Sequence, residues 1–240
     1  MIPLFYDLHI HSCLSPCGDD DMTPANLVGM AALKGLDVIA LTDHNSCKNC
    51  PAAVKHGEAY GVTVIPGMEL TTAEEVHVVC LFPDLEAALA FDDYVYGHIL
   101  PIKNREEVFG RQQIMNEQDQ VTGTVDKLLI SATDISFDEV FSLAASYRGL
   151  AYPAHIDKSS TSLLSNLGFV PPDSTFTCAE INDYKHLHQI QKEHPYFLGC
   201  HIIHCSDAHY LQDIHEPYCQ INAESKKISH ILDSLSRRPT

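Results

Sequence analysis

Histidine and carboxylate side chains recur in or directly after short apolar runs of this sequence, and both are common metal ligands. Such residues occur at the following positions: His9, His11, Asp43, His44, Glu69, His77, His155, Asp207 and His209. Any one of them, taken alone, is more commonly a hydrogen-bonded structural residue. Gathered in one place, they would be costly to bury unless they paired or bound ions. Nitrogen and oxygen donors in this number suit two or three zinc, manganese or iron ions better than magnesium or calcium.

The apolar runs beside these residues have the length and pattern of buried strands. We expect strands at 6–11, 37–41, 62–65, 75–82, 149–153, 177–181 and 201–205. We expect helices at 23–34, 51–60, 84–96, 105–118, 137–147 and 224–237. Because strands and helices alternate, the pattern predicts parallel strands covered by helices, as in a barrel-like α/β fold. In such a barrel the functional residues lie at the carboxyl ends of the strands, where most of these ligands fall.

The domain organisation is expected to be simple. No linker rich in Ser and Gly divides the 240 residues, and 45% of them are hydrophobic, which is enough for one sizeable core. We therefore expect a single domain over residues 1–240. The segment from about 97 to 133 is the least regular part of the chain, and we interpret it as an insertion over the barrel rim.

The charge balance limits the expected partners. Fifteen Lys and Arg against 32 Asp and Glu give a net charge of −17, which disfavours long nucleic acids and anionic membranes. A small anionic substrate remains compatible, because bound cations can reverse the local field. No apolar run approaches the ~18 residues of a membrane span, and the first residues lack the pattern of a secretory signal. With nine cysteines, several of them inside apolar runs, we expect reduced thiols and a cytoplasmic protein.

Five short blocks of sequence carry a resemblance to a known family. They are Asp7-Leu8-His9-Ile10-His11-Ser12, Leu41-Thr42-Asp43-His44-Asn45, Gly67-Met68-Glu69-Leu70, Pro153-Ala154-His155 and Ser206-Asp207-Ala208-His209. In this order they closely resemble the motif signature of the PHP (polymerase and histidinol phosphatase) family. The resemblance implies a distorted, TIM-like (β/α)7 barrel with a trinuclear metal centre that hydrolyses phosphoesters.

The resemblance also implies how the metals share their ligands. The first metal would be held by His9, His11, Glu69 and Asp207, and the second by the bridging Glu69 with His77 and His155. The third would be held by His44, His209 and an acid from the loop after His11. Family members commonly carry Ser-Asp-Gly in that loop, whereas this chain reads Cys13-Leu14-Ser15-Pro16-Cys17-Gly18-Asp19-Asp20-Asp21. The alternatives are Asp19, Asp20 and Asp21; we favour Asp20, and Asp21 could instead cap the next helix.

These observations predict a metal-dependent phosphoesterase that acts on a small phosphorylated metabolite or a short nucleotide. A water held between two metals has a lowered pKa, and the resulting hydroxide can attack phosphorus near neutral pH. The catalytic residues would be Glu69, Asp207 and His209, with Asp207 or His209 protonating the leaving oxygen. Asp43 would orient the adjacent ligand His44 without binding metal itself. Two other classes stay open: a non-catalytic metal-binding regulatory module and a metal-dependent amidohydrolase.

Fixed cations and aromatic rings near the strand ends are candidates for substrate binding. Lys158 lies three residues after His155, and Lys103, Arg105 and Arg111 lie in the insertion over the rim. Each could contact a phosphate, with Lys158, Arg105 and Arg111 favoured, although each taken singly is more commonly a solvated surface charge. The aromatic candidates for stacking on a base or ring are Phe109, Tyr152, Tyr184 and Tyr210, for which core packing is the alternative.

Two cysteine pairs follow the first and second predicted strands. Three residues separate Cys13 from Cys17, and two separate Cys47 from Cys50. Four thiolates could hold an additional zinc ion or an iron–sulfur cluster, and a C-x-x-C pair can also be redox-active. Reduced cysteines without a ligand are the alternative.

Overall fold

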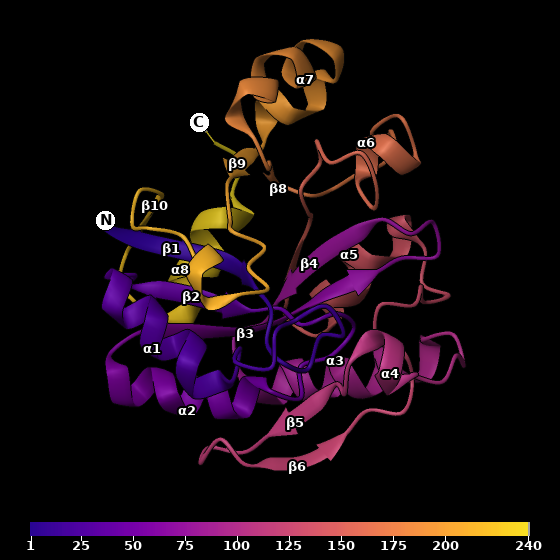
Figure 1. Ribbon diagram of the computed structural model, residues 1–240. Coiled ribbons are helices and arrows are strands. Elements are labelled where there is room, and N and C mark those ends of the chain that lie inside the picture. The colour runs from indigo at the N-terminus through magenta and orange to yellow at the C-terminus, as the bar shows by residue number, and fades with distance from the viewer. Residues whose placement is uncertain (240) are drawn as a thin grey trace.

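A computed structural model describes residues 1–239 and places the longest strands in one curled sheet (Figure 1). From edge to edge, its six strands are β10 (Gln220–Ala223), β1 (Ile2–Ile10), β2 (Val38–Leu41), β3 (Thr63–Thr71), β4 (His77–Leu81) and β7 (Leu150–Pro153). β8 (Cys178–Glu180) and β9 (His201–Ile203) form a separate parallel pair. Both sheets contribute to one inner apolar cluster, which includes Leu8, Ala40, Val79, Cys178 and Ile203. The sheets therefore curl around a shared core as a half-barrel.

The strand directions differ from the parallel barrel that the sequence predicted. β1, β2 and β3 are parallel, but β4 runs antiparallel to both β3 and β7, and β10 runs antiparallel to β1. The cause at β4 is a turn, in which Thr72 and Val76 are joined by a 2.9 Å backbone hydrogen bond. A connection this short cannot hold the crossover that parallel strands need. The α/β class is confirmed, and the described strands form a half-barrel where a closed (β/α)7 barrel was expected.

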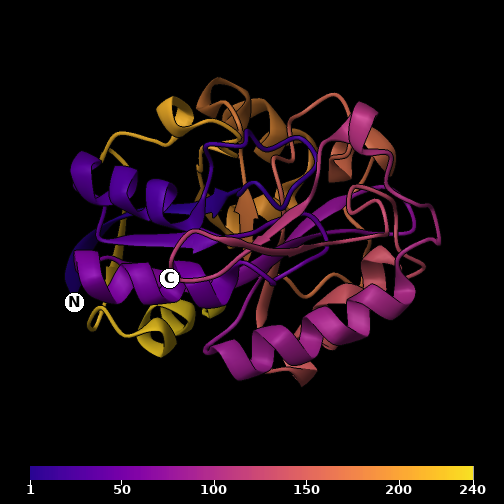
Figure 2. The same cartoon turned by 60° about the horizontal axis from the view of Figure 1, so that its bottom comes forward.

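Helices cover the outer side of the curled sheet (Figures 1 and 2). The longer ones are α1 (Pro24–Lys34), α2 (Cys50–Tyr60), α3 (Leu85–His98), α5 (Phe137–Ser146) and α8 (Ile228–Ser236). Shorter ones are α4 (Glu106–Phe109), α6 (Leu163–Asn166), α7 (Leu187–Glu193) and the 3₁₀ turns η1 (Tyr184–His186), η2 (Pro195–Gly199) and η3 (Leu211–Asp213). Thr23, and not Asp21, caps the first turn of α1, and Gly35 ends the helix in the left-handed conformation. Within residues 1–239, no helix combines the length and apolarity that crossing a membrane requires.

The predicted helix at 105–118 is wrong. Only α4 is helical, and it ends at Gly110, whose φ of 81° is left-handed. β5 (Gln113–Met115) and β6 (Val121–Thr124) then form an antiparallel hairpin. Asn116 stabilises the turn, because its side-chain oxygen accepts the backbone N–H groups of Gln118 and Gln120. Local turn chemistry therefore outweighs the helical pattern here.

The β5–β6 hairpin packs on the loops that follow β1 and β2. Gln113 donates its backbone N–H to the carbonyl oxygen of Cys13 at 3.0 Å. The Asn49 side chain donates to Ser12 Oγ and to the carbonyl oxygen of Gln113, and accepts the N–H of Met115 at 2.8 Å. These buried bonds fasten the hairpin to segments that lie beside the predicted ligands.

Gly57 lies where α2 packs closely against β3. A Cβ at this position would lie 2.6 Å from the carbonyl oxygen of Val62 and 2.7 Å from Cγ2 of Val64. We expect Gly57→Ala to lower the free energy of unfolding by about 1–3 kcal/mol, because the helix must move away from the strand. Gly29→Ala in α1 is the control, since its Cβ would meet only ordinary contacts at 3.8 Å. Urea unfolding followed by circular dichroism compares the two; equal stability losses would contradict the close approach.

Candidate metal centre

The strands deliver histidines and acids to one edge of the curled sheet. His9 and His11 lie at the end of β1, two residues apart and so on one face, and both are fully buried. His44 follows β2, and Glu69 lies within β3. His77 is the first residue of β4, and it reaches the same edge because β4 runs antiparallel to β3. The unexpected strand direction is therefore what brings this imidazole to the site.

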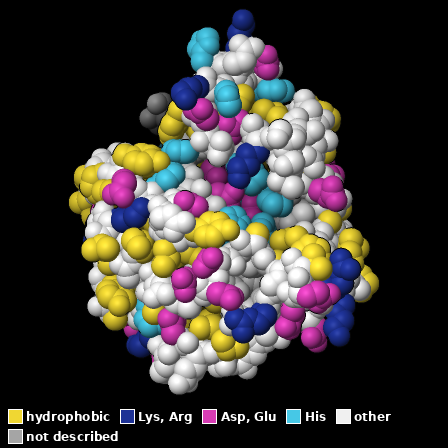
Figure 3. Space-filling model, in the orientation of Figure 1, with side chains coloured by type: hydrophobic (Ala, Val, Ile, Leu, Met, Phe, Trp, Pro, Cys, Tyr) yellow, Lys and Arg dark blue, Asp and Glu magenta, His cyan; other side chains and the backbone are white. Residues whose placement is uncertain are grey.

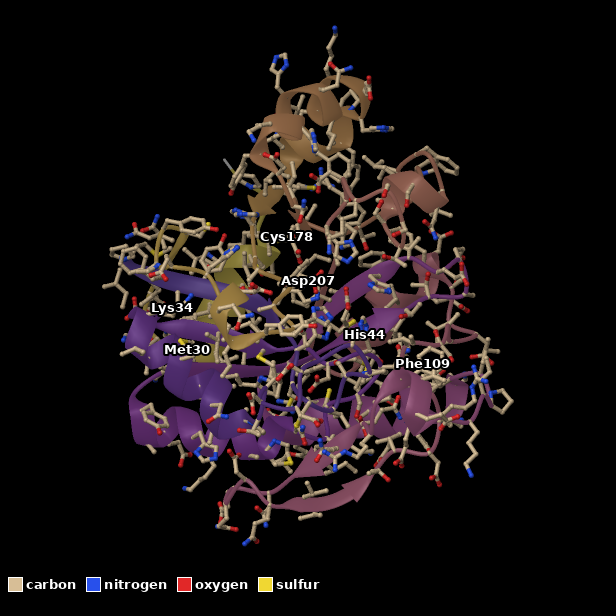
Figure 4. The ribbon with its side chains drawn as sticks, in the orientation of Figure 1. Met30, Lys34, His44, Phe109, Cys178 and Asp207 are labelled. Atoms are coloured by element: carbon tan, nitrogen blue, oxygen red, sulfur yellow. The ribbon has the colours of Figure 1, made fainter. Side chains whose placement is uncertain are left out.

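The loops after β7 and β9 complete the set. His155 follows β7, with a φ of 27°, and Asp207 follows β9, with a φ of 51°; both values are unusual for residues other than glycine. The loop after β9 is fastened to β1, because the N–H of His11 donates to the carbonyl oxygen of Ala208 at 2.9 Å. Figure 4 places the labelled His44 and Asp207 together at the centre of the molecule. Figure 3 shows acids and histidines gathered there in a hollow.

The carboxylate of Glu69 is the centre of this arrangement. It is fully buried, and five imidazoles contact it. Contacts to Oε1 come from His77 at 2.8 Å, His155 at 3.1 Å and His9 at 3.2 Å. Contacts to Oε2 come from His44 at 2.9 Å and His11 at 3.4 Å. One acid thus joins residues from β1, β2, β4 and β7.

Asp207 forms a second acidic centre beside Glu69. Its Oδ1 lies 3.1 Å from Nε2 of His11 and 3.4 Å from Nε2 of His9. The ring of His209 stacks on that of His11 with 4.2 Å between centroids. The Lys158 amine donates to Oδ2 of Asp207. Asp207 therefore connects the buried histidines to a cation at the edge of the hollow.

The surroundings of both acids favour their charged forms. Burial alone would raise the pKa of Glu69, but the neighbouring imidazoles, His77 and His9 foremost, hold it well below its ordinary value. Burial opposes ionisation of Asp207 in the same way, and the charge of His9 with the hydrogen bond to His11 lowers the pKa of that carboxyl. Both groups are carboxylates at neutral pH, as metal ligands must be.

The pKa values of His9 and His11 shift in opposite directions. Burial would lower the pKa of His9, but Glu180, Glu69 and Asp207 raise it well above its usual value. Burial lowers the pKa of His11, and nearby His209 lowers it further. The three acids around His9 therefore favour a positive charge at this place, which a proton or a metal ion could supply.

The donor atoms at this centre fit metal ions. The Nδ1 atoms of His9 and His11 are occupied by Glu180 at 2.8 Å and Ser15 at 2.9 Å, so both Nε2 atoms, 3.2 Å apart, face Glu69 and Asp207. Buried His44 Nδ1 and Glu69 Oε2 lie 2.9 Å apart without hydrogen-bond geometry, and His155 Nδ1 is buried with no hydrogen-bond partner. A metal ion would stabilise imidazole nitrogens and carboxylate oxygens that face one another at such short distances.

Within residues 1–239, three groups of residues place their donor atoms within 4.8 Å of one another. They are His9, His11, Glu69 and Asp207; then His44, Glu69 and His77; then His11, His44 and His209. The first group is the one that the resemblance implies for the first metal. In the second group His44 stands where His155 was expected, although His155 still contacts Glu69. In the third group His11 accompanies the expected His44 and His209.

No acid of the loop after His11 belongs to these groups. Asp20, the favoured candidate, is exposed and accepts hydrogen bonds from Arg111 at 3.1 Å and from Gln113 at 2.7 Å. Asp19 instead accepts the N–H of Asp21. Cys17 of the same loop is exposed as a residue and joins no donor group, although partial burial of its thiol and the charge of Glu69 raise its pKa to about 12.

Asp43 is linked by hydrogen bonds to His11, whereas the sequence predicted that it would orient His44. It is buried and accepts hydrogen bonds from the hydroxyls of Ser12 and Ser15 at 2.6 and 2.7 Å. Ser15 in turn accepts from Nδ1 of His11 and from the backbone N–H of His44. Asp43 therefore orients His11 through Ser15, as outer carboxylates orient metal-binding imidazoles.

Glu180 is a site residue that sequence reasoning missed. It ends β8, is 1% exposed, and accepts the Nδ1 proton of His9 at 2.8 Å. This contact fixes the ring orientation and leaves Nε2 of His9 free to bind. The available signal was an acid at the end of the strand expected at 177–181, which is the position that the other site residues occupy.

The predicted substrate-binding cations lie in different places. Lys158 contacts Asp207 at the hollow. Arg111 pairs with Asp20, and Arg105 stacks on Phe109, with 5.9 Å between the guanidinium carbon and the ring centroid. Lys158 is therefore the one of these three that contacts a residue of the cluster.

The four cysteines proposed for an extra metal do not gather. Cys47 and Cys50 both direct their thiols to the carbonyl oxygen of Gly67, at 3.1 and 3.5 Å. Cys13 instead contacts the carbonyl oxygen of Gln113. All nine cysteines are free, and within residues 1–239 no cysteine belongs to a potential metal-binding group. An additional zinc or iron–sulfur site gains no support from this arrangement.

Comparison with known proteins agrees with this site. A family model described as the PHP domain matches residues 7–229. The chain therefore belongs to the PHP domain family, as its motifs indicated. The folded chain is also similar to the crystal structure of a lesion-specific endonuclease, endonuclease Q, from Pyrococcus furiosus, with a TM-score of 0.68 and 19% identity over 98% of this chain and 56% of that one.

Two relatives match by sequence over shorter stretches. An uncharacterised protein of Methanocaldococcus jannaschii is 32% identical over 98 residues, which is 37% of this chain and 57% of that protein. A 5′-3′ exoribonuclease of Haemophilus influenzae is 35% identical over 79 residues, which is 32% of this chain and 28% of that enzyme. The matched stretches span less than two thirds of either relative. The Haemophilus influenzae relative is named as an exoribonuclease, and the Pyrococcus furiosus structure as a lesion-specific endonuclease.

Removal of Glu69 tests the centre directly. We expect Glu69→Ala to lower the affinity for divalent metal by at least about 100-fold, because two of the three donor groups lose their shared carboxylate. Metal content after dialysis, measured by mass spectrometry, checks this, with the exposed Glu193→Ala as control. An unchanged metal content in a folded Glu69→Ala protein would contradict the shared role.

Glu180→Ala should lower the metal affinity less than Glu69→Ala does, because Glu180 orients His9 and belongs to none of the donor groups. We expect metal affinity to fall about 10- to 100-fold, and Glu180→Gln, which keeps an acceptor for Nδ1, to lose less. Competition with a chromophoric chelator measures both. The orienting role fails if Glu180→Ala binds metal as tightly as the parent protein.

Proposed function

We propose that this chain is a metal-dependent phosphoesterase that hydrolyses a phosphoester bond in a small phosphorylated metabolite or a short nucleotide. The observation that carries the proposal is the buried carboxylate of Glu69 in contact with five imidazoles, beside Asp207 and below the cation of Lys158. We also propose that residues 1–240 form a single domain, in which the segment from about 97 to 133 is an insertion over the barrel rim.

Zinc, manganese or iron would be held by the three donor groups around Glu69. Ions there would neutralise phosphoryl oxygens and lower the pKa of a water that attacks phosphorus. The protein's own part is to hold these donors in place, with Glu180 and Asp43 fixing the rings of His9 and His11. Positioning of this kind supplies most of the catalysis in phosphoryl transfer.

Two residues would handle charge and protons on the substrate. Lys158 stays protonated, because Asp207 raises its pKa although burial opposes this. It would bind a phosphoryl oxygen as its contact with Asp207 loosens. The Nδ1 of His209 donates to the carbonyl oxygen of Asp207 at 2.7 Å. Its Nε2 is then the atom that either binds an ion or protonates the leaving oxygen.

The expected exclusion of long nucleic acids lacks support. It rested on the net charge of −17, which describes the average surface and not the metal-lined hollow. A relative of this chain is named as an exoribonuclease, and the similar structure is that of a lesion-specific endonuclease. Nucleic-acid ends and single strands therefore belong in the substrate search.

The function is tested by turnover with defined metals. Protein loaded with manganese, zinc or iron is assayed against phosphomonoesters, phosphodiesters, short oligonucleotides and amides. Metal-dependent release of phosphate or nucleotide, lost in Glu69→Ala, supports the phosphoesterase. Cleavage of amides alone would select an amidohydrolase, and metal binding without turnover of any compound would select a regulatory module.

Lys158→Met separates substrate binding from metal binding. We expect KM to rise about 10-fold with unchanged metal content, because the variant loses one charge-assisted contact and no ligand. Lys185→Met is the matched control, since the Lys185 side chain is 88% exposed. Steady-state kinetics on the best substrate of the panel measure both variants. An unchanged KM in Lys158→Met would remove this residue from substrate binding.

A further inference from the structure

Four aromatic rings form a continuous cluster outside the metal centre: Tyr184, His204, His215 and Tyr218, here called the ring cluster. The ring centroids of His204 lie 5.4 Å from Tyr184, 4.7 Å from His215 and 6.0 Å from Tyr218, and those of His215 and Tyr218 lie 4.9 Å apart. The rings come from η1, the end of β9 and the loop before β10. Three separate segments therefore converge on one surface.

The ring cluster is connected to the metal centre through the segments that carry Glu180 and Asp207. Tyr184 follows Glu180, which holds His9, and His204 lies three residues before Asp207. Asp7 joins the segments, since its carboxylate accepts the N–H of Ser206 at 3.0 Å and that of His215 at 3.2 Å.

Unlike the phenylalanines of the core, these rings meet solvent. Tyr184 is 47% exposed and Tyr218 is 57% exposed, whereas Phe82 and Phe91 are fully buried. The cluster also offers unused polar atoms. His204 donates Nδ1–H to the carbonyl oxygen of Ile181 at 2.9 Å, which leaves Nε2 without a hydrogen bond to the protein. His215 Nδ1 is buried with no partner at all.

We propose that the ring cluster binds the base of a nucleotide, or of a single-stranded nucleic-acid end, whose phosphoester lies at the metal centre. The inference rests on the proposed function and narrows its substrate class. Two half-exposed tyrosine rings beside the Nε2 of His204, which bonds to no described residue, suit a neutral planar group that stacks and forms hydrogen bonds. No Lys or Arg belongs to the cluster, so the base and not the phosphate is the group that it binds.

Binding measurements with matched ligands test this proposal. Isothermal titration of the metal-loaded protein compares adenosine 5′-monophosphate with ribose 5-phosphate, which carries the same phosphoester without a base. We expect the nucleotide to bind about 10-fold more tightly, within the range that stacking of one base supplies. Equal affinities for the two ligands would overturn the proposal.

Variants separate recognition from folding. Tyr184→Ala with Tyr218→Ala should remove the preference for the nucleotide and leave the affinity for ribose 5-phosphate unchanged. Replacement of both residues by Phe should keep the preference, because stacking is retained. Tyr60→Ala is the control, since Tyr60 is 54% exposed and ends α2, outside the ring cluster. A preference for the nucleotide that survives the double Ala change would overturn the proposal.

Adenosine, which has no phosphate, distinguishes failure of this proposal from failure of the phosphoesterase. Saturable adenosine binding that the double Ala change abolishes supports the ring cluster even if no substrate is hydrolysed. Hydrolysis of phosphoesters with equal efficiency whether or not a base is present would support the phosphoesterase and overturn the ring cluster.

Discussion

The contact between one buried carboxylate and five imidazoles constrains the whole architecture. Glu69 has no access to solvent, and rings from four strands and their loops lie within 3.4 Å of it. A buried charge of this kind is tolerated only when partners surround it. The strands of the half-barrel must therefore end at one place, and the loops after β1, β7 and β9 must keep conformations that hold the rings in contact.

The mixed strand directions serve this constraint. In a purely parallel barrel, ligands come only from carboxyl ends and the loops that follow them. Here β4 reverses after a short turn, so its first residue, His77, faces the same carboxylate as the end of β3. β7 reverses again and delivers His155. The sheet thus supplies imidazoles to Glu69 from both ends of its strands while remaining covered by helices on one side.

The sequence predicted the ligand types and most elements, and the failures have physical causes. The site residues could be predicted because His and Asp directly follow short apolar runs, which is the pattern of polar residues at the ends of buried strands. The direction of β4 could not be predicted, because an apolar run has the same pattern in a parallel and in an antiparallel strand. The short turn at 72–76 determines the direction. The 105–118 helix failed because Gly110 and the Asn116 turn outweigh periodicity. Glu180 was overlooked because its role depends on His9, which is 171 positions away.

The pairing of Lys158 with Asp207 has a consequence for how ligands enter the hollow. A phosphate that takes the ammonium must separate it from an acid that stays in place, so the Asp207 carboxylate must then be balanced by its other partners, among them His9 and His11. Long-range attraction by an uncompensated lysine is weakened by salt over roughly 8–10 Å. Because the amine of Lys158 is already paired at short range, it contributes little to attraction of anions from a distance, and its own contact with a phosphate forms only after the anion has entered the hollow.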